Sequence, residues 1–247
     1  MTEDQLSNLW AFARGETPGT VFEQWFFKQE ELEGQLGEEL HFELLSSPYG
    51  DREQVWKLRK SLMTALEPLR RCECPTIRDM SAIPMGGDFY FEKVFEPLEE
   101  VIRYGPERWW LYISRCGTCS TNWLVAQDER IYDEFFMKRL SDAEVERAKA
   151  GQWPEQFQSY GDVLSVGCAT SNPPRFLDPM AASLIWTAED LLRERSDIKT
   201  QEVARVLGLS DRHAERLVER AKGHSDNAKW SFVGRLLESV GLRTRRR

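Results

Sequence analysis

The sequence has few of the features that mark membrane proteins and secreted proteins. No run of about twenty apolar residues occurs in its 247 residues, so we expect no membrane span. No apolar stretch follows Met1-Thr2-Glu3-Asp4, so we expect no signal peptide and a cytoplasmic location.

The common catalytic motifs are also missing. There is no Gly-x-Gly-x-x-Gly, no Gly-Lys-Ser/Thr phosphate loop and no His-Glu-x-x-His. The histidines are scattered, and none is close in sequence to a cysteine pair: His41, His213 and His224. One carboxylate run is typical of a solvated helix face rather than of a catalytic pair: Asp128, Glu129, Asp133 and Glu134. We therefore expect a protein that is not an enzyme, with an unrecognised enzyme as an open alternative.

Cysteine is scarce, but four of the five cysteines form two close pairs. Cys72 and Cys74 make a Cys-x-Cys pair, and Cys116 and Cys119 make a Cys-x-x-Cys pair. This spacing is typical of a four-thiolate zinc site, in which each turn supplies two sulfurs and no position is left open for catalysis. Reduced, partly buried cysteines are the alternative, and a disulfide is disfavoured in the cytoplasm. The sequence predicts one structural zinc ion, with Cys168 free.

Charge is divided unevenly along the chain, whose net charge is -8. Residues 1–180 contain 19 Lys and Arg against 31 Asp and Glu, a net charge of -12, whereas residues 181–247 contain 14 against 10, a net charge of +4. The acidic part would repel nucleic acid and attract a basic protein surface.

Residues 1–68 are predicted to form a helical part. Apolar spacing indicates helices over 4–13 and from about residue 20, and Asp51 is placed to cap a helix that continues to Leu66. The short apolar segment 41–45 fits either a helix or a strand.

Residues 69–172 are predicted to be a zinc-binding α+β part. Aromatic and β-branched residues on both sides of the second cysteine pair indicate a β-hairpin, 109–114 with 122–126, whose turn binds the metal. Helices are expected around it, over 97–104, 128–140, 142–150 and 153–164. The fold class is therefore α+β and mainly α, with a small zinc-clamped hairpin between helical N- and C-terminal parts.

Residues 173–247 are predicted to be helical, after a linker at Ser171-Asn172-Pro173-Pro174. Helices are expected over 178–195 and 228–239, followed by a basic tail at 243–247. Between them, Ala204, the turn residue Gly208, Ala214 and Leu217 resemble the helix-turn-helix pattern. A DNA-binding regulator is therefore one candidate function, although the second helix would present Glu as well as Arg to phosphates.

A longer pattern lies within residues 20–60. It consists of Phe22-Glu23-Gln24-Trp25, then Leu36-Gly37-Glu38-Glu39-Leu40-His41-Phe42-Glu43-Leu44-Leu45, then a Tyr49-x-Asp51 turn. This pattern resembles the immunity proteins, small acidic bacterial proteins encoded beside polymorphic toxins. The resemblance implies a cytosolic protein that binds a toxin and blocks its active site.

The leading interpretation is thus a zinc-stabilised protein-binding protein of immunity type with a basic, toxin-like partner and no membrane role. Carboxylates would steer the encounter, and exposed aromatic residues would supply affinity. The residues expected in these roles are Glu38, Glu39, Asp128, Glu129, Trp25 and Trp110.

Overall fold

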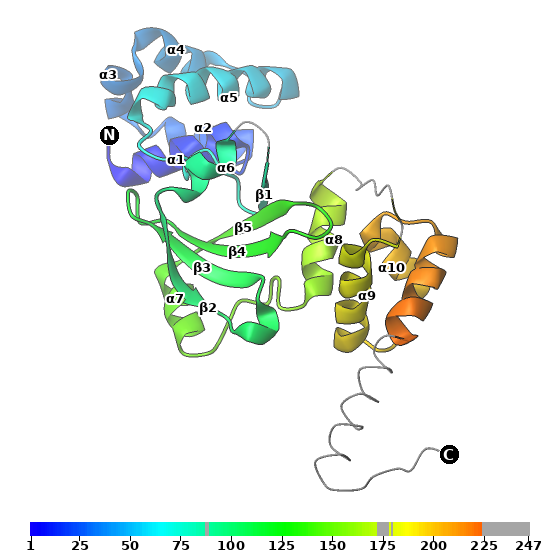
Figure 1. Ribbon diagram of the computed structural model, residues 1–247. Coiled ribbons are helices and arrows are strands. Elements are labelled where there is room, and N and C mark those ends of the chain that lie inside the picture. The colour runs from blue at the N-terminus through cyan, green and yellow to red at the C-terminus, as the bar shows by residue number, and fades with distance from the viewer. Residues whose placement is uncertain (87–88, 172–177, 179, 224–247) are drawn as a thin grey trace, which may run out of the picture.

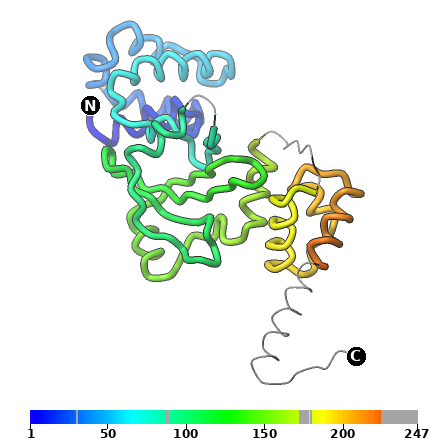
Figure 2. Tube along the Cα trace, viewed as in Figure 1, coloured from blue at the N-terminus to red at the C-terminus, as the bar shows by residue number. Residues whose placement is uncertain are grey.

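The computed structural model describes residues 1–86, 89–171, 178 and 180–223. It is α+β and mainly α, as predicted: helices gather at both ends of the molecule, and a five-stranded antiparallel sheet lies between them (Figure 1). The Cα trace in Figure 2 follows the same order, from the N-terminal helices through the sheet to the C-terminal helices. Within the described ranges, no helix has the length and hydrophobicity needed to cross a bilayer.

The N-terminal part consists of five helices joined by short turns, and its three predicted helical segments are confirmed. The helices are α1 (Glu3–Arg14), α2 (Gly19–Phe26), α3 (Glu33–Leu36), α4 (Glu38–Ser46) and α5 (Arg52–Leu66). Thr2 forms a capping box with Gln5 at the start of α1, and Gly15 ends α1 with φ of 84°. Asp51 accepts hydrogen bonds from the Glu53 and Gln54 amides, so it caps α5 as predicted.

These helices enclose a hydrophobic core of their own. Phe12 of α1 and Phe22 of α2 stack with ring centroids 3.8 Å apart, and Leu44 and Leu62 are fully buried beside them. The segment 41–45, which fits either period by sequence, is helical because it lies in α4 and places Leu44 in this core.

The sheet has the strand order β1-β5-β4-β3-β2 and is larger than the predicted hairpin. The strands are β1 (Ser81–Pro84), β2 (Leu98–Arg103), β3 (Leu111–Cys116), β4 (Asn122–Asp128) and β5 (Glu134–Leu140). The predicted hairpin is present as β3 and β4, which pair from Leu111 with Ala126 to Arg115 with Asn122. A short helix, α6 (Tyr90–Phe95), lies between β1 and β2.

Both faces of the sheet are covered. In β4, Leu124 packs into one hydrophobic cluster, and its neighbours Trp123 and Val125 pack into another on the opposite face. The first cluster includes the helices that follow the sheet, and the second includes Cys74 and Cys116. The strand alternation therefore brings the cysteines to the face opposite the C-terminal helices.

The helix predicted over 97–104 is wrong, because these residues form the edge strand β2. Its pairing with β3 has an irregularity between Glu100 and Ile102, so Val101 is an extra residue. Because of this bulge, Leu98 packs on one face of the sheet and Ile102 on the other. The extra residue Val101 adds an apolar i+3 position to Leu98 and Ile102, and this i, i+3, i+4 pattern imitates a helix.

The helix predicted over 128–140 is also wrong, because residues 134–140 form β5. Phe135 packs on one face and Phe136 on the other. A strand that is covered on both faces has apolar residues without strict alternation, so the helical period fitted equally well.

The remaining described helices follow the sheet. They are α7 (Asp142–Lys149), α8 (Tyr160–Thr170), α9 (Ala182–Glu194), α10 (Thr200–Leu207) and a helical segment over 211–223. Ser141 and Glu144 form a capping box at the start of α7, which confirms the helix predicted over 142–150. The helix predicted over 153–164 is only partly correct, because α8 starts at Tyr160, where Ser159 caps it.

The C-terminal helices share a core with the sheet. Leu184 and Leu191 of α9 and Val203 of α10 belong to the same hydrophobic cluster as Leu111 and Phe136. In Figure 1, α8 lies between the sheet and the α9–α10 pair. The predicted helix over 228–239 and the basic tail over 243–247 lie outside the described residues, and the division at 68 and 172 stays a prediction.

Candidate metal centre

The four paired cysteines come together as the spacing predicts. Cys72 and Cys74 lie in the loop between α5 and β1, Cys116 is the last residue of β3, and Cys119 lies in the β3–β4 turn. Their sulfur atoms all lie within 4.8 Å of one another. Within the part of the chain that the structure describes, no other group of three or more such side chains is close enough to hold an ion. Cys168 lies outside the cluster, on α8.

Backbone hydrogen bonds shape the turn that carries Cys116 and Cys119. The Cys116 amide donates to the Thr121 carbonyl at 2.9 Å, and the Ser120 amide donates to the Cys116 carbonyl at 2.8 Å. The Gly117 amide donates to the Pro97 carbonyl at 2.8 Å, which ties the turn to the start of β2. The second ligand pair is therefore held in place by the sheet itself.

The cluster has a buried side and an exposed side. Cys74 and Cys116 are each 1% exposed, whereas Cys119 is at the surface. The indole Nε1 of the buried Trp123 donates a hydrogen bond to the Cys74 sulfur at 3.3 Å. Such a donor stabilises negative charge on a sulfur that water cannot reach.

The thiols perturb one another because they are so close. The pKa of Cys119 is lowered to about 4, chiefly by a hydrogen bond from the Cys74 thiol and with help from Thr121, although partial burial opposes this. The hydrogen bond to Cys119 and burial raise the pKa of Cys74, and burial raises the pKa of Cys72 to about 12. A cation bound by these sulfurs would take the place of thiol protons.

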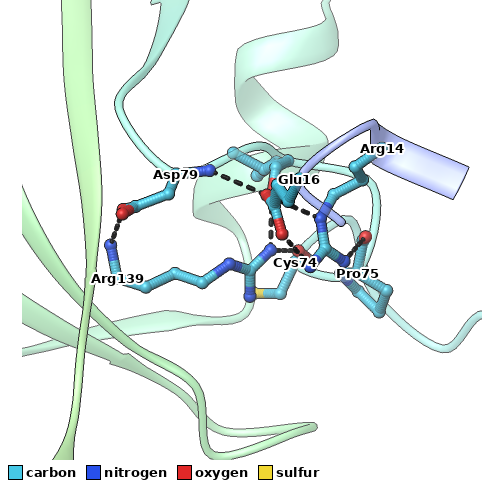
Figure 3. A network of polar contacts seen from close by, with 7 residues as sticks. Arg14, Glu16, Cys74, Pro75, Asp79 and Arg139 are labelled. Atoms are coloured by element: carbon cyan, nitrogen blue, oxygen red, sulfur yellow. Dashed lines mark hydrogen bonds and ion pairs between the residues drawn. The ribbon is translucent and has the colours of Figure 1, made fainter. Parts of the chain in front are cut away.

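Two arginines hold the loop that carries Cys74 (Figure 3). From β5, the Arg139 guanidinium donates to the Cys74 carbonyl at 2.7 Å and lies 4.5 Å from the Trp123 ring centroid. From α1, Arg14 donates to the Pro75 carbonyl at 2.5 Å. The loop is thus fixed to the sheet on one side and to the N-terminal helices on the other.

Carboxylates complete this network. Glu16 accepts hydrogen bonds from the Arg14 Nε at 2.8 Å and from the Asp79 amide at 3.0 Å. The Asp79 carboxylate accepts from the Arg139 amide at 2.8 Å. Together these contacts join α1, the cysteine loop and β5 in one polar network (Figure 3).

The chemistry of the donor set fits a metal ion. Four sulfur ligands at mutual separations below 4.8 Å match a soft or borderline cation with tetrahedral preference. Four protein ligands would fill a tetrahedral shell and leave no open position for water or substrate. The arrangement can therefore support structure but offers no catalytic position on the metal.

Of the two residues predicted as aromatic anchors, Trp110 is buried and Trp25 is half-buried. Trp110 is 4% exposed and donates its Nε1 proton to the Phe157 carbonyl at 2.8 Å, so its assignment as an anchor is wrong. Trp109 lies against Trp110 and under the Arg130 guanidinium. Trp25 is half-buried and packs on Phe22.

The steering role predicted for Asp128 is also wrong. Asp128 is completely buried and accepts hydrogen bonds from the Arg130, Ile131 and Tyr132 amides and from the Tyr160 hydroxyl. Its role is to close the β4–β5 turn, because the turn amides need an acceptor that solvent cannot supply. Glu129 is exposed, as a steering role requires.

The helix-turn-helix-like segment has the predicted local form. α10 ends at Gly208, which has φ of 64°, and a second helical segment spans 211–223. Ala214 and Leu217 are buried. The outward positions carry both signs of charge: Asp211, Arg212, Glu215, Arg216, Glu219 and Arg220.

No protein-family model, no curated protein and no solved structure matches this chain. Its function must therefore be inferred from the chemistry and surfaces of the chain itself.

Proposed function

We propose that this chain is a zinc-stabilised, non-enzymatic protein of the bacterial cytoplasm that binds a basic protein partner, in the manner of an immunity protein that neutralises a toxin. Zinc is the metal that we assign to Cys72, Cys74, Cys116 and Cys119. It would hold the cysteine loop against the β3–β4 turn, and its shell would be closed to catalysis.

The observation that carries the binding role is that most of the exposed large apolar side chains belong to the acidic N-terminal part. Of eleven exposed large hydrophobic residues in the described part, eight lie within residues 1–69, which are also strongly acidic. They are Met1, Val21, Phe27, Phe42, Leu45, Trp56, Met63 and Leu69. A concentration of apolar side chains among charges of one sign is typical of a protein interaction surface.

We expect one zinc ion per chain in freshly purified protein. The measurement is elemental analysis by inductively coupled plasma mass spectrometry, with a variant in which Cys116 and Cys119 are both serine as the control. A wild-type protein without zinc, or with the same zinc content as the double variant, would contradict the assignment.

The binding role predicts that acidic charge on α4 accelerates association. Once a partner is isolated with the full-length protein as bait, changing Glu38→Lys together with Glu39→Lys should slow association about tenfold at low salt. The difference should shrink as ionic strength rises, because salt screens exposed charges. Stopped-flow measurements over a salt series test this.

The matched control is Glu215→Lys with Glu219→Lys, which changes the net charge equally on the exposed face of the segment 211–223. Equal association rates for the two double variants would show that the α4 carboxylates have no special steering role. Failure to isolate any protein partner would count against the proposed function as a whole.

A DNA-binding regulator is the second candidate function. The Gly208 turn between α10 and the segment 211–223 favours it, because this geometry suits a helix-turn-helix. Against it, Glu215 and Glu219 lie on the outward face, where they would oppose phosphates. Tight, sequence-dependent and salt-sensitive binding of a short duplex by the full chain would promote this candidate over the first.

A further inference from the structure

A shallow groove is formed by α3 and α4 of the N-terminal part. Its volume is about 530 Å³, and it is lined by Glu33, Glu38, Glu39, His41, Phe42 and Leu45. Phe42 is 69% exposed and Leu45 is 40% exposed, so the apolar part of the lining faces solvent.

The register of α4 explains why these side chains point outward. Leu44 is fully buried in the N-terminal core, and the His41 ring packs against Phe26 with centroids 5.3 Å apart. Phe42 and Leu45 are three residues apart, so they share the other side of the helix. A single exposed phenylalanine is ordinary, but an aromatic and an aliphatic side chain that line one groove form a surface suited to burial against a partner.

The charge of the groove selects the kind of partner. No lysine or arginine occurs between Gln29 and Asp51. Among the described residues, Glu33, Glu38 and Glu39 form no ion pair and no side-chain hydrogen bond. These carboxylates are free to meet cations from outside, and they would repel nucleic acids and acidic proteins.

We propose that this groove is the docking site for the basic partner, and that the docking segment carries an apolar side chain flanked by lysine or arginine. The apolar side chain packs on Phe42 and Leu45, while the flanking cations meet Glu33, Glu38 and Glu39. This inference rests on the proposed function and locates the partner-binding site on the chain. Affinity comes from the exposed apolar surface of Phe42 and Leu45, and selectivity comes from the three carboxylates.

The test uses the full-length protein and three synthetic fluorescent peptides of equal length. The first is amphipathic with leucine and lysine, the second replaces each leucine by serine, and the third replaces each lysine by glutamate. Anisotropy titrations should show binding of the leucine–lysine peptide, weaker binding of the serine–lysine peptide and no binding of the leucine–glutamate peptide. Equal binding of the first two peptides would overturn the apolar half of the proposal.

The decisive variant is Phe42→Ser, which should weaken binding of the leucine–lysine peptide about tenfold, the loss expected for one buried aromatic contact. Because Phe42 is exposed, the fold should survive, and circular dichroism checks this. Trp186→Ser is the control: Trp186 is 56% exposed on α9, far from the groove in sequence, and its loss should leave the affinity unchanged. Equal losses in the two variants, or none in Phe42→Ser, would overturn the site.

Binding experiments with the natural partner test the groove and the proposed function separately. A partner that binds wild-type and Phe42→Ser protein with the same affinity would overturn the groove and leave the proposed function in place. A wild-type protein that dimerises in sedimentation velocity, with a monomeric Phe42→Ser variant, would make a second copy of this chain the occupant and would also overturn the proposal.

Discussion

Replacing Cys116 by serine should destabilise the protein by about 3 kcal/mol or more, because the free energy of binding a structural metal is largely folding free energy. Cys116 is 1% exposed, lies at the end of β3 and would share the metal with the loop that carries Cys74. Its loss would release that loop from the sheet. For a chain of this size, such a loss lowers the melting temperature by roughly 10 °C.

Differential scanning calorimetry with and without a zinc chelator measures this effect. The chelator should lower the wild-type midpoint and leave the Cys116→Ser midpoint nearly unchanged. Cys168→Ser is the matched control, because Cys168 is a free cysteine outside the cluster. If Cys116→Ser and Cys168→Ser both had the wild-type melting temperature, the metal would have no structural role.

Asp128→Ala should cost about 4 kcal/mol, although the residue belongs to no binding site. The carboxylate is fully buried, and its removal leaves three backbone amides and the Tyr160 hydroxyl without their acceptor. Each buried donor left unsatisfied costs on the order of 1–3 kcal/mol, and some recover by relaxation or by an entering water.

Urea unfolding followed by tryptophan fluorescence gives the free energy of unfolding. Glu129→Ala is the control, because Glu129 is the next residue but is exposed, and its change should stay within about 0.5 kcal/mol. A cost for Asp128→Ala as small as that for Glu129→Ala would mean that water replaces the carboxylate in the turn.

The sequence predicted those features that depend on local chemistry. Asp51 marked the start of a helix, and the two cysteine pairs marked the four-cysteine cluster. The Asp51 cap and each cysteine pair involve residues only a few positions apart, so each has a local signal, whereas bringing the two pairs together depends on the tertiary fold.

Features that depend on which neighbouring elements cover a strand or helix could not be predicted from the sequence. β5 is covered on both faces, so Phe135 and Phe136 gave no alternation, and the bulge at Val101 gave β2 a helical spacing. The same limit affected the residues predicted as aromatic anchors. An apolar residue in a turn or a short helix can face either the core or solvent. Only the packed structure shows that Trp110, in the turn before β3, is buried while Phe42 of α4 is exposed.

The edge strands β1 and β2 determine whether two molecules of this protein can pair through their sheets. β1 offers only four residues and ends at Pro84, which has no amide proton to donate. β2 is interrupted at Val101 and carries Glu99 and Glu100. In a β2–β2 contact, the same two carboxylates of a second copy would lie nearby and repel them. A strand from another molecule would therefore meet a short ladder at one edge and like charges at the other. Both edges of the sheet therefore disfavour edge-to-edge polymerisation, even though the chain exposes apolar side chains such as Phe42 elsewhere.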